Sequence, residues 1–178
     1  MRVFVTGTGR CGTVSFKIAC EAMTNYTVAH ETPCGHLLYP DNHIEVNPML
    51  RGCIAVVAET YPTAKWAHLI RTDRDACARS LATMEAGTIL QKWADIRFTT
   101  IPNRDPFEIG RAFWRDENAI IDNCLTACVP NAQRMVVRLE HAAADFAIFW
   151  DWISAEGNKE AAIATWQTPH HTTAERTK

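Results

Sequence analysis

The sequence lacks several features that would assign the chain to a broad class. Its seven cysteines include no Cys-x-x-Cys pair, so their spacing predicts neither a zinc site nor a disulfide framework. No apolar run is long enough to span a membrane. The net charge is only −2, which argues against nucleic-acid binding through bulk charge. We therefore expect a protein that binds neither membranes nor nucleic acids and that needs no metal.

Size and composition are those of an ordinary globular protein. The chain has 178 residues, of which 47% are hydrophobic and 21% charged, and this is enough for one domain with a real core. We expect a single α/β domain over residues 1–168 and a polar C-terminal tail over residues 169–178. Because the first residues already read as a strand, we expect no signal peptide and a cytoplasmic location. Cys124 and Cys128 lie in a predicted helix, where we expect buried thiols.

Hydrophobic patterns alternate between the periods of strands and helices. The order of these segments predicts a three-layer α/β fold with a mostly parallel central sheet flanked by helices. Residues 31–40 and 41–45 are expected to be loops. The strands are predicted at residues 3–6, 26–30, 65–70 and 134–140, and the helices at 16–23, 47–60, 72–84, 105–128, 145–154 and 159–166.

A glycine-rich segment, Gly7 to Thr13, connects the first predicted strand to the first predicted helix. Its sequence is Gly-Thr-Gly-Arg-Cys-Gly-Thr. A turn of this kind presents several backbone N–H groups to one point, and the dipole of the following helix adds positive potential. We therefore predict an anion site suited to phosphate.

This loop departs from the P-loop of nucleotide triphosphatases and kinases. Gly7 and Gly12 have the right spacing, but Thr13 occupies the lysine position and Val14 follows it. The lysine that contacts the β- and γ-phosphates and the hydroxyl that binds Mg²⁺ are thus missing. Arg10 supplies a cation in the middle of the loop instead, and its guanidinium can bind a phosphate or an attached sulfate without a metal.

At these residues the chain resembles the 5′-phosphosulfate loop of sulfotransferases, enzymes that use 3′-phosphoadenosine 5′-phosphosulfate (PAPS). The resemblance is to small bacterial or phage members and implies a P-loop-like fold. It also implies that Arg10 stabilises charge on the transferred sulfuryl group. The residues expected to hold the 5′-phosphosulfate are Gly9, Arg10, Cys11, Gly12, Thr13 and Val14.

A second part of the resemblance begins where the strand at residues 65–70 ends. Sulfotransferases bind the 3′-phosphate with an Arg at this strand end and a Ser in the next helix, and Arg71 and Ser80 match these roles. The separation is one residue longer than usual, and Thr-Asp replaces the usual Asp-Pro. Either the turn carries one extra residue and Arg71 keeps its role, or Arg74 or Arg79 shares the contact with the 3′-phosphate.

The candidate catalytic bases follow the second predicted strand. His30 and Glu31 leave its carboxyl end, and in an α/β sheet such residues face the same crevice as the phosphate loop. We expect this strand to lie beside that loop. An acceptor hydroxyl or amine needs a base to take its proton. From the residues alone, both His30 and Glu31 are candidates for this base. The resemblance favours Glu31, because its Glu-Thr context is similar to the catalytic site of tyrosylprotein-type sulfotransferases.

These observations lead to one expected function and two alternatives. We expect sulfuryl transfer from PAPS to a hydroxyl or amine of an acceptor that the sequence does not identify, whether glycan, protein or small molecule. The first alternative is a small-molecule or nucleotide kinase that uses ATP and Mg²⁺. The second is a non-catalytic nucleotide-binding module, which would need the anion site but not Glu31. The oligomeric state cannot be read from the sequence.

Overall fold

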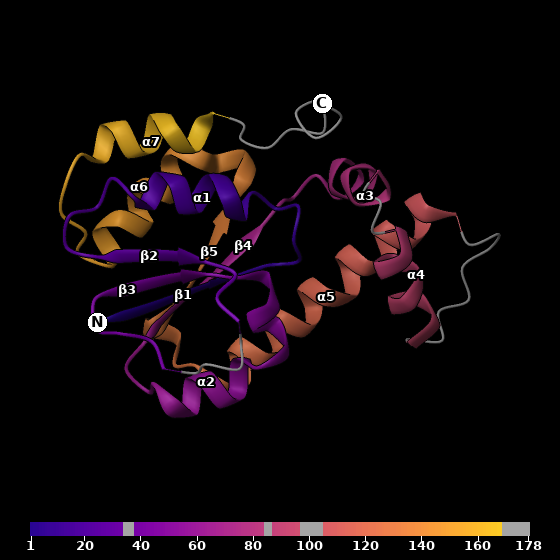
Figure 1. Cartoon of the computed structure of the whole chain (residues 1–178), viewed down its shortest axis with the longest axis horizontal. Coiled ribbons are helices and arrows are strands. Elements are labelled where there is room, and N and C mark those ends of the chain that lie inside the picture. Colours follow the sequence, from indigo (N-terminus) through magenta and orange to yellow (C-terminus); the bar gives the residue numbers. More distant parts are fainter. Residues whose placement is uncertain (34–37, 84–86, 97–104, 169–178) are drawn as a thin grey trace.

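A five-stranded, all-parallel sheet runs through the middle of the molecule (Figure 1). The computed structural model describes residues 1–33, 38–83, 87–96 and 105–168. The strand order is β2-β3-β1-β4-β5, so β1 is central. The strands are β1 Arg2–Thr6, β2 Thr27–His30, β3 His43–Val46, β4 Lys65–Ile70 and β5 Arg134–Arg138.

The strand β3 corrects the expectation that residues 41–45 form a loop. All four of its residues are buried. Ile44 and Val46 pack in the main core, whereas His43 and Glu45 lie on the opposite face of the strand, where they hydrogen bond to other polar groups. The alternation of polar and apolar residues over these four positions is a strand pattern, but it is short and follows a segment predicted to be loop. Since β3 pairs with both β1 and β2, β2 does not lie beside β1 as expected.

Helices cover both faces of the sheet, which confirms the expected three-layer α/β arrangement (Figure 1). One face carries α1 Thr13–Cys20, α6 Ala142–Trp152 and α7 Lys159–Gln167. Its core includes a cluster of aromatic rings, in which the centroid of the Phe16 ring lies 5.0 Å from that of Phe149 and 5.1 Å from that of Trp166. The other face carries α2 Ile54–Thr60 and α5 Pro106–Cys128, packed on a core that includes Phe4 and Trp66.

Three helix starts follow the capping signals in the sequence. Asn47 accepts a hydrogen bond from the Met49 N–H at 2.8 Å, although the chain first forms a 3₁₀ turn, η1 Pro48–Gly52, before α2. Asp73 accepts from the Ala76 N–H and caps α3 Arg74–Ala82. Asp105 caps α5. Side-chain caps of this type satisfy amides that have no partner within the helix.

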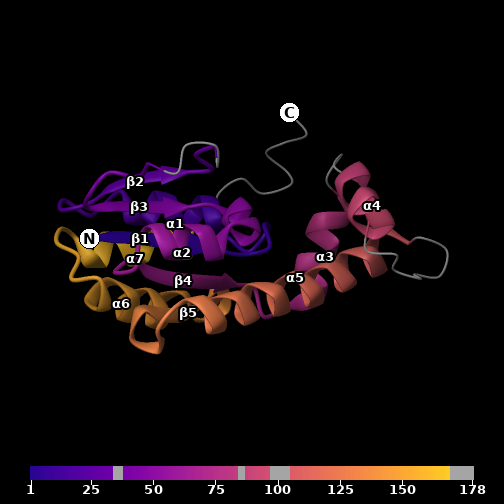
Figure 2. The ribbon, with the colours of Figure 1, turned by 90° about the horizontal axis from the view of Figure 1, so that it is seen from below.

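A helical region extends past the carboxyl ends of the strands (Figures 1 and 2). It consists of α3, α4 Gly87–Ile96 and the first half of α5, which share their own core cluster. Buried Glu117 accepts hydrogen bonds from Trp93 Nε1 and Arg51 Nε, both at 2.8 Å. Glu117 thus ties α4 and α5 to the segment that follows β3.

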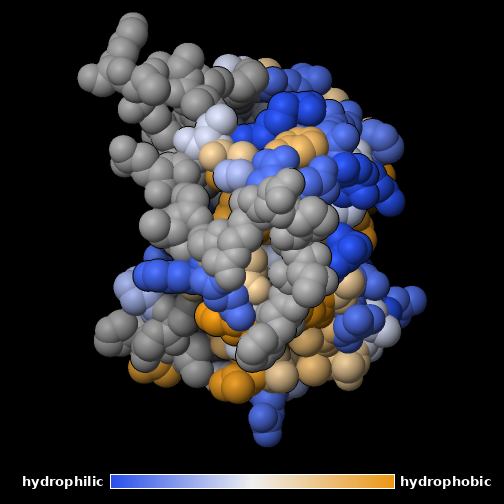
Figure 3. Space-filling model, turned by 90° about the vertical axis from the view of Figure 1, so that its right-hand side faces the viewer, coloured by the Kyte–Doolittle hydropathy of each residue, from blue (hydrophilic) through white to orange (hydrophobic). Residues whose placement is uncertain are grey.

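Figure 3 views the molecule from the end formed by these helices, where hydrophobic residues gather in the lower part and hydrophilic ones at the upper right.

The prediction of buried thiols at the end of α5 is wrong in part. Cys124 is half-buried, but Cys128 is exposed, because the helix ends there, beyond Leu125, its last side chain in the core cluster. The expected polar tail, residues 169–178, lies outside the described residues. Within the described ranges, no helix is both long and apolar enough to cross a membrane.

Candidate functional site

The loop from Gly7 to Gly12 connects β1 to α1 at the carboxyl end of the central strand. Gly7 is required by close packing, since a Cβ there would lie 2.4 Å from the Leu69 carbonyl oxygen of β4. Gly12 has φ 93° and is the N-cap of α1, a conformation that costs glycine little. A Cβ at Gly12 would also lie 3.1 Å from the Trp166 ring of α7. The loop is thus held against both the sheet and the last helix.

Helix α1 begins at Thr13, three residues earlier than the sequence predicted. Its N-cap, Gly12, has no side chain that could cap the helix. Cys11 and Thr13 are buried, whereas Gly9, Gly12 and Val14 are half-buried. Backbone N–H groups at a helix start, together with the positive end of the helix dipole, can attract phosphate or sulfate. The anion-binding role of the loop stays a prediction.

Arg10 connects this loop to α3. Its Nε donates a hydrogen bond to Ser80 Oγ at 2.8 Å, and Arg10 itself has φ 56°. The sequence analysis placed Arg10 at the 5′-phosphosulfate and Ser80 at the 3′-phosphate. The structure brings the two side chains into direct contact, so the two predicted half-sites are neighbours.

Cys77 of α3 lies beside the loop. Its Sγ lies 3.9 Å from the Gly9 carbonyl oxygen. Burial raises the pKa of the Cys77 thiol to about 11; the positive charges of Arg71 and Arg10 act in the opposite direction, and the charge of Glu140 acts with burial. Arg71 directly follows β4.

Arg74 and Arg79, the alternatives to Arg71 for the 3′-phosphate, are both on the surface. Arg74 is exposed, and its Nε lies 3.3 Å from Asp75 Oδ1, with both side chains more than 40% exposed. Arg79 is also exposed. Arg71, by contrast, is half-buried, so it is the least exposed of the three candidate arginines.

Glu140, which follows β5, holds the turn after Arg71. Its Oε2 accepts hydrogen bonds from the Thr72 N–H at 2.8 Å and the Thr72 hydroxyl at 2.7 Å, and its Oε1 accepts from the Asp73 N–H at 3.0 Å. Partial burial raises the pKa of the Glu140 carboxyl, but these donors outweigh it and the net pKa is lowered. The carboxylate is therefore ionised at neutral pH and fixes the turn.

His30 and Glu31 leave the carboxyl end of the edge strand β2. Glu31 has φ 55°, its N–H donates to the Val46 carbonyl oxygen, and its side chain is 55% exposed. His30 Nε2 lies 4.0 Å from Glu31 Oε1, which is too long for a hydrogen bond. That buried nitrogen has no hydrogen-bond partner among the described residues.

The position of β3 separates these candidate bases from the phosphate loop. With neighbouring strands about 4.8 Å apart, the ends of β2 and β1 are roughly 10 Å apart, and Arg71 lies on the other side of β1. The candidate bases and Arg71 therefore flank the loop from opposite sides.

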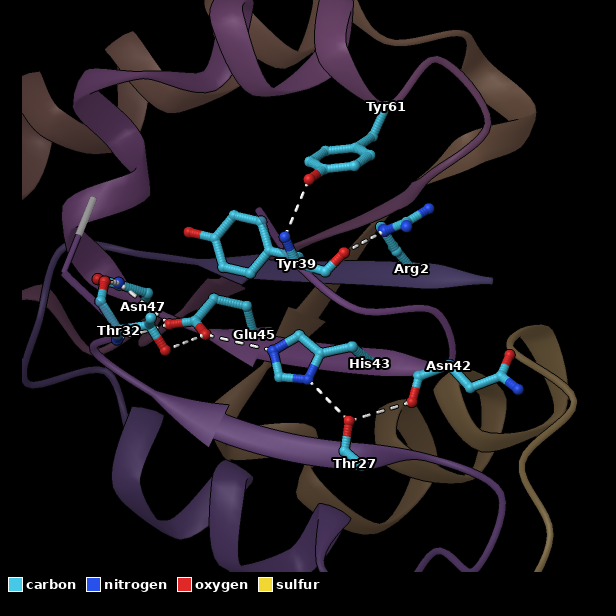
Figure 4. A network of polar contacts seen from close by, with 9 residues as sticks. All are labelled: Arg2, Thr27, Thr32, Tyr39, Asn42, His43, Glu45, Asn47 and Tyr61. Carbon is cyan, nitrogen blue, oxygen red and sulfur yellow. Dashed lines mark hydrogen bonds and ion pairs between the residues drawn. The ribbon is translucent and has the colours of Figure 1, made fainter. Parts of the chain in front are cut away.

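A buried polar network fixes the turn that carries Glu31 (Figure 4). Glu45 of β3 is fully buried, and its carboxylate accepts from the Thr32 N–H at 2.9 Å, the Thr32 hydroxyl at 2.7 Å and Asn47 Nδ2 at 3.1 Å. His43 Nε2 lies 3.5 Å from Glu45 Oε2, and its Nδ1 lies 2.9 Å from Thr27 Oγ1. Burial raises the pKa of the Glu45 carboxyl, but its hydrogen bonds outweigh burial and the net pKa is lowered. A buried charge with this many donors is well satisfied.

Sequence reasoning missed Glu45 and His43 as parts of this site, because it assigned them to a loop. The signal was the alternation of polar His43 and Glu45 with apolar Ile44 and Val46, a period of two that is typical of strands.

The chain was also compared with known proteins. No family model matches it, and no curated protein matches it either. The resemblance to sulfotransferases therefore rests on the loop, Arg71 and Ser80, and the Glu-Thr turn, and on how the structure arranges them.

Proposed function

We propose that the chain is a PAPS-dependent sulfotransferase, which transfers a sulfuryl group to a hydroxyl or amine of an acceptor. One observation carries the proposal: Arg10, in the loop before α1, donates a hydrogen bond to Ser80 of α3, and Arg71 follows β4, the strand beside β1. Two arginines and a hydroxyl next to an anion-binding helix start suit a ligand with two separate anionic groups. PAPS carries such groups at its 5′ and 3′ positions.

Each part of the site then has a defined task. Arg10 and the amides from Cys11 to Val14, with the Thr13 hydroxyl, hold the 5′-phosphosulfate. Arg71 and Ser80 hold the 3′-phosphate. Because Arg10 contacts Ser80, the two anionic groups of one nucleotide lie within reach of a continuous set of donors.

The reaction needs one bond to form and one to break. The acceptor oxygen or nitrogen forms a bond to sulfur, while the bond between sulfur and the bridging phosphate oxygen breaks. Glu31 takes the acceptor's proton, and 3′-phosphoadenosine 5′-phosphate leaves with the electron pair. Arg10 and the loop amides stabilise the charge that develops on the leaving oxygen. His30, next to Glu31, is the alternative base.

A calorimetric titration tests the nucleotide assignment. We expect 3′-phosphoadenosine 5′-phosphate to bind about tenfold to a hundredfold more tightly than AMP without Mg²⁺, the range expected for one charge-assisted contact. Arg71→Ala should remove most of this preference. Arg74→Ala is the matched control, because Arg74 is exposed and paired with Asp75, and it should leave the preference intact.

Three other outcomes would each change the assignment. Equal affinity for the two nucleotides would contradict a 3′-phosphate site. Loss of the preference in Arg74→Ala alone would move the role to Arg74. Tighter binding of ATP with Mg²⁺ than of 3′-phosphoadenosine 5′-phosphate would favour the kinase alternative.

A further inference from the structure

The two turns that carry Glu31 and Arg71 are held in the same way. In each, a threonine directly follows the candidate residue, and a carboxylate from the neighbouring strand region accepts both the threonine N–H and its hydroxyl. Glu45 does so for Thr32, at 2.9 and 2.7 Å. Glu140 does so for Thr72, at 2.8 and 2.7 Å. We call these the Glu45–Thr32 contact and the Glu140–Thr72 contact.

The Glu140–Thr72 contact is part of a set of hydrogen bonds that occupies the backbone of its turn. The N–H groups of Thr72 and Asp73 both donate to Glu140, so neither is available to bind a phosphate. The carbonyl oxygen of Arg71 accepts from Trp114 Nε1 of α5 at 2.8 Å. The Arg71 carbonyl oxygen and the next two backbone N–H groups are therefore all paired, which fixes this turn and leaves the Arg71 side chain to contact an anion.

We propose that Glu140 is a positioning residue which, through Thr72, aims the Arg71 guanidinium at the 3′-phosphate of the nucleotide. The inference rests on the proposed function, since it assumes that Arg71 binds this group. Glu140 itself touches no ligand, because its carboxylate would repel a phosphate and is already occupied by the turn. It acts by holding the Arg71 backbone within the narrow range of positions from which a hydrogen bond to phosphate forms.

The Glu45–Thr32 contact provides a matched control within the same chain. It has the same chemistry, but it holds the turn of Glu31, on the other side of β1 from Arg71. Removing the Thr32 hydroxyl should therefore leave nucleotide binding unchanged, although it removes the same kind of hydrogen bond.

The experiment is calorimetric titration of five proteins with 3′-phosphoadenosine 5′-phosphate and with AMP. The proteins are the wild type and the Thr72→Val, Thr72→Ser, Glu140→Gln and Thr32→Val variants. Valine keeps the shape of threonine and loses the hydroxyl, whereas serine keeps the hydroxyl. We expect Thr72→Val to weaken 3′-phosphoadenosine 5′-phosphate by about threefold to tenfold, as for one hydrogen bond, and to leave AMP unchanged.

The other variants show whether the loss of affinity comes from the Thr72 hydroxyl or from a general change in the fold. Thr72→Ser should restore most of the lost affinity, and Thr32→Val should match the wild type with both nucleotides. Glu140→Gln should shift affinity in the same direction as Thr72→Val. An unchanged preference in both Thr72→Val and Glu140→Gln would overturn the inference, as would an equal loss for both nucleotides. If the wild type itself does not distinguish the nucleotides, the proposed function fails instead.

Discussion

The Glu45–Thr32 and Glu140–Thr72 contacts share one geometry but lie in different surroundings. Glu45 is 0% exposed and lies inside the sheet, with His43 and Asn47 as further partners. Glu140 is exposed at the end of β5, and its other donor is a backbone N–H. The same hydrogen bonds therefore serve two purposes. The buried contact is part of what keeps the sheet folded, whereas the exposed one can change local geometry at little cost to overall stability.

This difference follows from the solvent around each carboxylate. A buried donor that loses its acceptor finds no water to replace it, and the cost is about 1–3 kcal/mol for each unsatisfied group. An exposed donor exchanges its lost partner for water, and the net cost is small. Substitutions at the two contacts should therefore separate a loss of stability from a loss of function.

The largest expected effect separates the Glu31 turn from the Arg71 turn in catalysis. Glu31→Gln keeps the shape of the side chain and removes the base, so turnover should fall by about 10²–10⁴-fold. The affinity for 3′-phosphoadenosine 5′-phosphate should stay the same, because Glu31 is not part of the nucleotide site. The measurement is sulfuryl transfer from labelled PAPS, after a screen of glycans, peptides and phenols for an acceptor, with calorimetry on the same proteins.

The controls for this prediction are His30→Ala and Arg10→Ala. Arg10→Ala should lower both turnover and PAPS affinity, because Arg10 contacts the group that is transferred. Full turnover in Glu31→Gln with none in His30→Ala would make His30 the base. If neither change affects turnover while PAPS still binds, the chain is better described as a nucleotide-binding module.

The next effect is on stability. Glu45→Gln keeps the volume but replaces an acceptor oxygen with a donor, so it leaves at least one buried donor of Thr32 or Asn47 without an acceptor. We expect it to lower the free energy of unfolding by about 1–3 kcal/mol. Glu140→Gln makes the same change at the exposed site, and it should cost less than about 1 kcal/mol. Urea unfolding of both variants measures the difference, and equal losses would contradict the comparison of buried and exposed contacts.

The smallest expected effect is on the loss of folding stability at low pH. Both carboxyls have a pKa below the usual 4.5 in the folded protein, so the unfolded chain binds more protons as the pH falls through this range. Each contact therefore stabilises the fold above pH 4.5 and loses this contribution as the pH falls through the lowered folded pKa. Glu45→Gln and Glu140→Gln should therefore each flatten the loss of stability in acid. Urea midpoints measured from pH 4.5 downward test this, and a pH dependence equal to that of the wild type in both variants would contradict it.

The strands and helices that the sequence predicted correctly carry local signals. The glycines at positions 7 and 12 fit a turn from strand to helix, and Asn47, Asp73 and Asp105 fit helix starts. Each of these residues acts within a few positions of itself, so its role can be read from neighbours in the chain. The strand β3 was missed because His43 and Glu45 are polar and buried. What makes them acceptable there is their hydrogen bonding to Thr27 and Thr32, which are distant in the sequence.

The sequence by itself determined the α/β class and the glycine-rich connection from β1 to α1, and it supplied the residues on which the proposed function rests. Hydrophobic periodicity, glycine and capping residues are local properties, and local physics is enough to read them. Only the tertiary structure decided that β3 stands between β2 and β1, that Arg10 meets Ser80, and that Glu45 and Glu140 hold the turns of Glu31 and Arg71. These depend on which strands pair and which loops meet at one sheet edge, and strand order is set by packing over the whole chain rather than by any single segment.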